Sequence, residues 1–151
     1  MAEKIWLTVP GALRYRDVAV RVVAEAARLI SGSARRDEKE ILANDVRDPF
    51  DTAVVSAFME IYNNVAIHAY RREATGRIDI EITTHEREIV IEVSDTGRPF
   101  DISRVTALPA ELDPAALPEG GMGIHIARTM LDEVSYQPGP PNKWRLSKVR
   151  T

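Results

Sequence analysis

The sequence predicts an α+β fold, a two-layer sandwich in which helices cover one face of a mostly antiparallel sheet. An alternating strand begins the chain, two helical patterns follow, and a pair of alternating strands comes directly after the second helix. Strands joined by short turns pair antiparallel, and helices with one apolar stripe need a surface to cover. With 151 residues and 44% hydrophobic content, the chain has the size of one domain, which we expect to span residues 1–151.

The first two elements are a strand and an amphipathic helix. Residues 4–9 alternate between apolar and polar types, and Pro10-Gly11 ends the strand. From residue 14 to residue 30, apolar residues recur at three- and four-residue steps. They are Val18, Val22, Ala26 and Leu29. We expect this face of the helix to pack into the core. Residues 31–50 are rich in serine, glycine and charge, which predicts a solvated connection.

The remaining elements carry the expected site. A second helix begins at Asp51 or Thr52, either of which can cap it, and runs to about Glu73. Residues 78–82 and 89–93 then alternate as the two strands of a hairpin. Residues 95–123 predict a long loop of the kind that forms lids or binding segments. A third helix over residues 123–133 and two short strands complete the chain.

Charge and residue usage argue against several classes of protein. Lysine and arginine number 20 against 23 aspartates and glutamates, so the net charge is -3 and we expect neither a nucleic acid nor a membrane partner. The chain has no cysteine, which removes disulfides and thiolate metal sites. No stretch approaches the roughly 18 apolar residues of a membrane span, and the N-terminus has no signal pattern. We expect a cytoplasmic protein.

A line of polar residues stands out in the second helix. Glu60, Asn64 and His68 are four residues apart, so a helix brings them onto one side between apolar faces. An asparagine carbonyl suits Mg²⁺, and a nearby carboxylate can accept a proton from a hydroxyl. Taken alone, the spacing is more typical of a solvated face. His68 has no second ligand at metal spacing, so we exclude a zinc site and expect a packed or hydrogen-bonded histidine.

Two further motifs change that balance. Asp95-Thr96-Gly97 directly follows a strand, where the carboxylate can accept a hydrogen bond from a base amino group and Gly97 lets a ligand approach the backbone. Glu119 and the following Gly120-Gly121-Met122-Gly123 lead into the third helix, whose unpaired N–H groups and positive dipole end can bind an anion. Each motif alone is weak, since the first is typical of a turn and the second of a linker.

Together, and in this order, the motifs resemble those of the GHKL ATPase superfamily, most closely its branch of anti-sigma factor serine/threonine-protein kinases. The resemblance covers nearly the whole chain. Residues 60–70, with the sequence EIYNNVAIHAY, look like the N box of that branch. Residues 95–101, DTGRPFD, look like its adenine-binding loop. Residues 120–134 look like its phosphate loop and following helix.

The resemblance implies a Bergerat-type fold, a histidine-kinase-like ATP-binding domain with ATP and Mg²⁺ as cofactors. In such a site Asn64 would ligate Mg²⁺, Glu60 is the candidate general base, and Asp95 would read adenine. The other implied nucleotide-binding residues are His68, Gly97, Gly120, Gly121, Met122, Gly123, Ile124 and Asn142. Many members carry a threonine just before the last strand. Residues 141–146 contain none, and Asn142 could supply an equivalent polar group.

The implied activity is an ATP-dependent serine/threonine kinase that phosphorylates a STAS-type anti-sigma-factor antagonist. In the other state of this partner-switching system it sequesters a sigma factor, and the family leads us to expect a homodimer. The alternative is a nucleotide-responsive binding module without phosphotransfer, favoured by Asn142 and by a lid with only Arg98 and Arg104 as cations. A sensor histidine kinase needs a phosphoacceptor histidine on a helical hairpin, and no histidine precedes the N box. Gyrase- and chaperone-like ATPases attach further domains, for which we expect no room.

Overall fold

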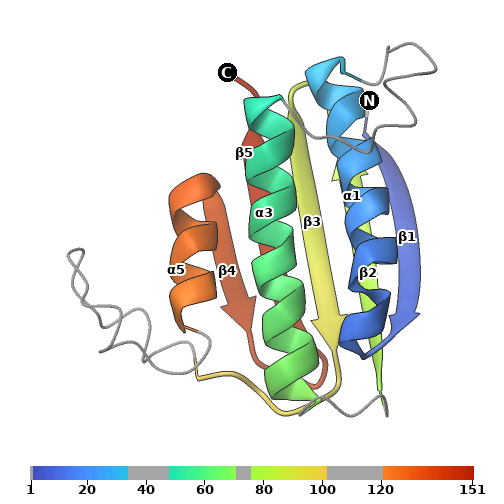
Figure 1. Cartoon of the computed structure of the whole chain (residues 1–151), viewed down its shortest axis with the longest axis vertical. Coiled ribbons are helices and arrows are strands. Elements are labelled where there is room, and N and C mark those ends of the chain that lie inside the picture. Colours follow the sequence, from blue (N-terminus) through green and yellow to red (C-terminus); the bar gives the residue numbers. More distant parts are fainter. Residues whose placement is uncertain (1, 34–47, 71–75, 102–120) are drawn as a thin grey trace.

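The computed structural model describes residues 2–33, 48–70, 76–101 and 121–151. In this part of the chain, three α-helices lie along one face of a five-stranded sheet (Figure 1). The helices are α1 (Arg16–Ser31), α3 (Pro49–Asn64) and α5 (Gly121–Met130). The strands are β1 (Glu3–Pro10), β2 (Arg77–Thr84), β3 (Glu88–Asp95), β4 (Glu133–Gln137) and β5 (Asn142–Val149). The predicted α+β sandwich is confirmed.

The order of the strands brings distant parts of the chain together. The sheet runs β1-β2-β3-β5-β4, and every neighbouring pair is antiparallel. β5 therefore lies between β3 and β4, and its first residue pairs with the last residue of β3, Asn142 with Asp95. On the helix side of the sheet, Ile80 lies opposite Val93, and Val93 lies opposite Trp144. All three are buried, so this row forms part of the core beneath the helices.

α1 buries a different face from the one that the sequence predicts. Val18 and Leu29 are 51% and 64% exposed, so their placement in the core is wrong. Val22 is half-buried and packs against the core. Of the four predicted core residues, only Ala26 is fully buried. The core-facing residues are Ala19, Val23, Ala26, Ala27 and Ile30. The helix has two apolar stripes side by side, and the one rich in alanine allows a closer approach to α3 and the sheet.

α3 begins before the predicted caps. Asp48 is the N-cap, because its Oδ1 accepts hydrogen bonds from the N–H groups of Phe50 (2.8 Å) and Asp51 (3.4 Å), and Pro49 follows at the first helical position. Asp51 instead is buried and accepts bonds from serine hydroxyls near the end of α1. The prediction of Asp51 or Thr52 as the cap is therefore wrong.

The end of α3 and the start of α5 also differ from the prediction. After Asn64 the chain continues as a π-helical turn, Val65–Ala69, and the predicted end near Glu73 falls outside the described residues. α5 begins at Gly121, two residues earlier than predicted, and ends at Met130. Its buried residues include Ile124 and Ala127, which anchor it against the core. Within the residues described, no helix has the length and apolar character that a membrane crossing needs.

Candidate nucleotide site

Asn64 lies at the C-terminal end of α3 with its side chain buried at 5% exposure. Among the residues that the structure describes, its Oδ1 atom has no hydrogen-bond partner. Leaving a buried carbonyl unpaired costs about 1–3 kcal/mol, so an acceptor of this kind calls for a ligand. A neutral amide oxygen is a suitable ligand for Mg²⁺, which usually keeps several waters and takes few protein ligands. The residue present at this position therefore fits the metal that the sequence predicts.

Glu60 lies one helical turn before Asn64 and is half-buried. A Cβ atom built on Gly123 would lie 2.5 Å from its Oε2 atom, so the carboxylate lies directly against the start of α5. Only a glycine allows this approach without displacing the carboxylate. The candidate base is thus held beside the helix terminus that is expected to receive the phosphates.

The predicted phosphate-binding residues occupy the first turn of α5. Gly121, Met122, Gly123 and Ile124 are the first four residues of the helix, and in an α-helix the first four N–H groups have no intrahelical acceptor. The positive end of the helix dipole adds to their attraction for an anion. The sequence places Gly121 and Met122 in a loop before the helix, which is wrong, because they belong to the helix itself. Gly120 lies outside the described residues.

Asp95 ends β3 and is 3% exposed. Its Oδ1 atom accepts hydrogen bonds from the Gly97 N–H and from Asn142 Nδ2, both at 2.9 Å. Asn142 Nδ2 also donates to the Gly97 carbonyl at 2.9 Å, so these three residues form one bonded group. Burial raises the pKa of the Asp95 carboxyl, and the bonds from Asn142 and Gly97 offset part of that rise. The structure thus brings together three residues that the sequence predicts for the nucleotide site.

His68 lies in the π-helical turn, not in α3. The four-residue spacing that predicts a single polar line assumes α-helical geometry, so the argument holds only from Glu60 to Asn64. The ring of His68 lies edge-on to the ring of Phe100, with 6.3 Å between centroids. This contact agrees with the packed histidine that the sequence predicts, and the nucleotide-binding role that the resemblance implies for His68 stays a prediction.

A cluster of three aromatic side chains at the predicted adenine-binding loop, residues 95–101, was not predicted from the sequence. The rings of Phe100, Tyr136 and Trp144 contact one another, with centroids 4.5 to 6.5 Å apart. The Phe100 N–H donates to the Tyr136 hydroxyl at 2.8 Å, which fixes the chain that follows Gly97. The signal was available in part, because Tyr136 and Trp144 face each other across the β4 and β5 pair. Their meeting with Phe100 depends on the fold.

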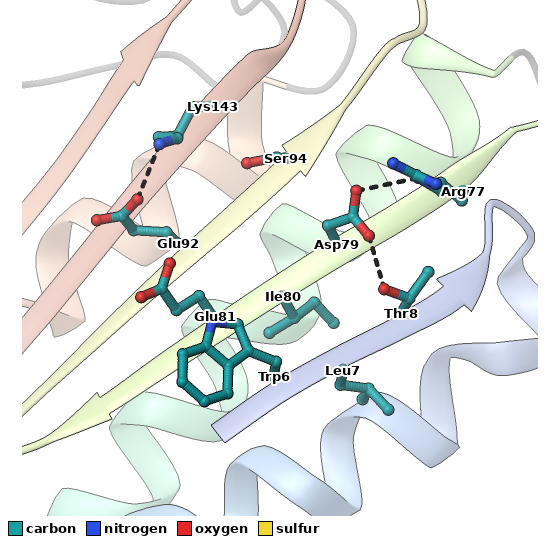
Figure 2. A pocket seen from close by; sticks show the side chains of 10 residues that line it. All are labelled: Trp6, Leu7, Thr8, Arg77, Asp79, Ile80, Glu81, Glu92, Ser94 and Lys143. Atoms are coloured by element: carbon teal, nitrogen blue, oxygen red, sulfur yellow. Dashed lines mark hydrogen bonds and ion pairs between the residues drawn. The ribbon is translucent and has the colours of Figure 1, made fainter. Parts of the chain in front are cut away.

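A hollow of about 290 Å³ lies on the other face of the sheet, away from the helices. Figure 2 shows that it is lined by side chains of β1, β2, β3 and β5, including exposed Trp6. Its carboxylates are already paired: Asp79 with Arg77 at 3.2 Å, and Glu92 with Lys143 at 3.1 Å. None of the predicted site residues lines this hollow, so the candidate nucleotide site lies elsewhere.

Comparison with known proteins identifies a family that matches most of the chain. Residues 11–148 match the family described as the histidine kinase-like ATPase domain. The chain is 32% identical to the serine-protein kinase RsbW of Bacillus licheniformis over 85 residues, which cover 54% of this chain and 53% of that protein. RsbW of Bacillus subtilis is 29% identical over the same shares. RsbW of Bacillus cereus is 27% identical over 136 residues, covering 87% of this chain and 76% of that protein.

The chain thus spans about half the length of the first two relatives and three quarters of the third. The matched region includes every predicted site residue, from Glu60 to Asn142. The predicted resemblance to the GHKL superfamily is confirmed, because this chain belongs to the family of histidine kinase-like ATPase domains.

Proposed function

We propose that this chain is one ATP-binding domain that binds Mg-ATP and phosphorylates a serine or threonine of a STAS-type anti-sigma-factor antagonist. In its other state it would hold a sigma factor, and with such partners it would act in the cytoplasm. The observation that carries the proposal is the buried Asn64 Oδ1, which has no hydrogen-bond partner among the described residues. It lies one turn from Glu60, whose carboxylate lies against Gly123 in the first turn of α5. The serine-protein kinase names of the relatives support the same reaction.

Each residue has a distinct part in this reaction. The Asp95 carboxylate would accept a hydrogen bond from the adenine amino group, and the first N–H groups of α5 would bind phosphate oxygens. Asn64 Oδ1 would hold Mg²⁺, which when bound neutralises phosphate charge. The substrate hydroxyl oxygen attacks the γ-phosphorus as the bond to the leaving oxygen of ADP breaks. Glu60 accepts the proton of this hydroxyl, so that no positive charge builds up on the attacking oxygen during the transfer.

The direct test is transfer from γ-labelled ATP to the candidate antagonist encoded nearest to this chain's gene. We expect a phosphoprotein that forms only with Mg²⁺, and loss of the label when the acceptor serine or threonine is replaced by alanine. Binding of Mg-ATP with capture of the partner but no transfer would favour the alternative, a nucleotide-responsive binding module.

Replacement of Asn64 separates a metal ligand from a structural residue. In Asn64→Leu we expect the affinity for ATP to lose its dependence on Mg²⁺, because the oxygen ligand is absent. The free energy of unfolding should stay equal or rise, since the variant removes a buried carbonyl that has no partner within the described parts of the chain. Calorimetric titration of ATP at several Mg²⁺ concentrations and urea denaturation measure the two effects. A destabilised variant with an unchanged Mg²⁺ requirement would show that Asn64 is structural.

The edge of the molecule formed by α1 and β1 supports our proposal of a homodimer. α1 and β1 lie at the same edge of the sheet (Figure 1). On α1 the large hydrophobic side chains Val18 and Leu29 are 51% and 64% exposed, and Trp6 of β1, on the other face of the sheet, is 71% exposed. The exposed apolar side chains of α1 are of the kind found on a surface that contacts another protein.

We expect Leu29→Asp to shift the protein toward the monomer, because a charge would be buried in the interface. Its unfolding temperature at low concentration should stay the same, since Leu29 is not in the core. Thr129→Asp, at an exposed position on α5, is the matched control and should leave the oligomeric state unchanged. Sedimentation equilibrium measures the outcome. Equal masses for the wild type and both variants would contradict a dimer through α1.

A further inference from the structure

The hydroxyl of Tyr70 joins segments that the nucleotide site needs to hold in place. Tyr70 directly follows the π-helical turn and is 8% exposed. Its Oη atom accepts a hydrogen bond from the Thr96 N–H at 3.1 Å and donates to the Arg77 carbonyl at 2.6 Å. One atom therefore connects the end of the Asn64 helix, the start of β2 and the loop that carries Asp95 and Gly97.

The ring of Tyr70 is held on both edges by glycines. A Cβ atom on Gly11 would lie 2.4 Å from ring atom Cδ2, and one on Gly76 would lie 2.2 Å from Cε1 on the opposite edge. The Gly11 N–H also donates to the Gly76 carbonyl at 2.7 Å, which closes the slot around the ring. With both edges confined, the direction of the hydroxyl is fixed before any ligand binds.

A second connection ties the same loop to the same helix end. The Arg98 N–H donates to the Ala69 carbonyl at 2.9 Å, using one of the carbonyls that a helix end leaves free. Gly97 approaches so closely that a Cβ atom there would lie 2.4 Å from the Ala69 oxygen. The loop is thus fixed on the sheet side by Asn142 and on the helix side by Ala69 and Tyr70.

We propose that Tyr70 is a positioning residue for base recognition. It sets the place of the Thr96 amide, and with it the Asp95 carboxylate, relative to the helix that carries Asn64. The inference rests on the proposed function, because it assumes that Asp95 reads the base. Loss of the hydroxyl leaves the Thr96 N–H without its acceptor and loosens the loop on one side. The first turn of α5 makes no bond to Tyr70 within the described structure, so phosphate binding should be spared.

The test compares Tyr70→Phe with Tyr62→Phe. Tyr62 is fully buried in α3, and its hydroxyl donates to the Ala12 carbonyl at 2.8 Å, away from the loop. In Tyr70→Phe we expect the affinity for Mg-ATP to fall about 10-fold and the preference for ATP over inosine triphosphate to narrow. Affinity for inorganic tripolyphosphate, which has no base, should be unchanged. Tyr62→Phe should keep all three values, whereas equal losses in both variants, or an equal loss of tripolyphosphate binding, would overturn the inference.

A second measurement needs no nucleotide. Amide hydrogen exchange should be faster at Thr96 in Tyr70→Phe than in the wild type, and unchanged there in Tyr62→Phe. Unchanged protection of the Thr96 amide in Tyr70→Phe would overturn the positioning role by itself. Failure of the wild type to bind ATP would instead overturn the proposed function, and base recognition with it, so the two failures are distinguishable.

Discussion

Asp95→Asn is expected to lower the affinity for Mg-ATP by about 100-fold while the protein stays folded. Oδ1 of Asp95 already accepts hydrogen bonds from the Gly97 N–H and Asn142 Nδ2. An asparagine at this position must keep its oxygen toward those two donors, which places its NH₂ group where Oδ2 now lies. That NH₂ would face the adenine amino group, donor against donor, and a mismatch in a buried site is heavily penalised.

The same replacement should change which base is preferred. Inosine triphosphate presents a carbonyl oxygen where ATP presents an amino group, so it can accept a hydrogen bond from the new NH₂. We expect Asp95→Asn to bind inosine triphosphate more tightly than ATP, reversing the wild-type order. Calorimetry with both nucleotides measures this order. An unchanged preference for ATP in the variant would show that Asp95 does not read the base.

The stability of Asp95→Asn should rise relative to the wild type as the pH increases. Burial raises the pKa of the Asp95 carboxyl above its usual value of 3.8. The folded state therefore binds this proton more tightly than the unfolded state. The contribution of Asp95 to stability is full below pH 3.8 and is lost as the pH rises through the folded-state pKa. Urea denaturation at a series of pH values, from below pH 3.8 upward, gives the free energy of unfolding of both proteins. Groups that titrate alike in the two proteins cancel in the difference between these free energies. A difference independent of pH would contradict the raised pKa.

Glu60→Gln is expected to reduce phosphotransfer by about 100- to 10,000-fold with little change in Mg-ATP affinity. Glutamine keeps the shape of the side chain against Gly123 but accepts no proton from the attacking hydroxyl. Because we propose that Asp95, Asn64 and α5 hold the nucleotide, the loss should fall on kcat. Single-turnover transfer and calorimetry separate the two quantities.

The matched control is Glu81→Gln. Glu81 lines the hollow on the other face of the sheet (Figure 2). It removes the same charge and should leave transfer unchanged. Transfer at the wild-type rate in Glu60→Gln would exclude Glu60 as the base, and equal losses in both variants would point to a general effect of charge.

The strands were predictable because apolar and polar residues alternate along them. This alternation arises because helices cover one face of the sheet and leave the other face uncovered (Figure 1). Ile80 and Val93 alternate with polar neighbours, and this pattern alone places them in the core. α1 was not predictable in the same way, since Val18 and Leu29 keep helical spacing as regularly as Val23 and Ile30 do. Spacing identifies an amphipathic helix, but the side that becomes buried depends on what packs against it.

The sequence supplies candidate residues for the site but not the contacts between them. Motif order identifies Asn64 and Asp95 as candidates, whereas the bond between Asp95 and Asn142 requires that β5 pairs with β3. The role of Tyr70 was also hidden. Gly11 reads in the sequence as the end of a strand, and only the fold shows that it gives room to the ring of Tyr70. Local patterns do not contain contacts between segments so far apart in the chain.

A crystal structure of the chain with Mg²⁺ and a non-hydrolysable ATP analogue tests the proposed site most directly. We expect Asn64 Oδ1 at about 2.1 Å from the metal, the adenine amino group bonded to Asp95, and the phosphates at the first turn of α5. Nucleotide bound in the hollow beside Trp6 on the other face of the sheet, or bound with Asn64 away from the metal, would contradict it.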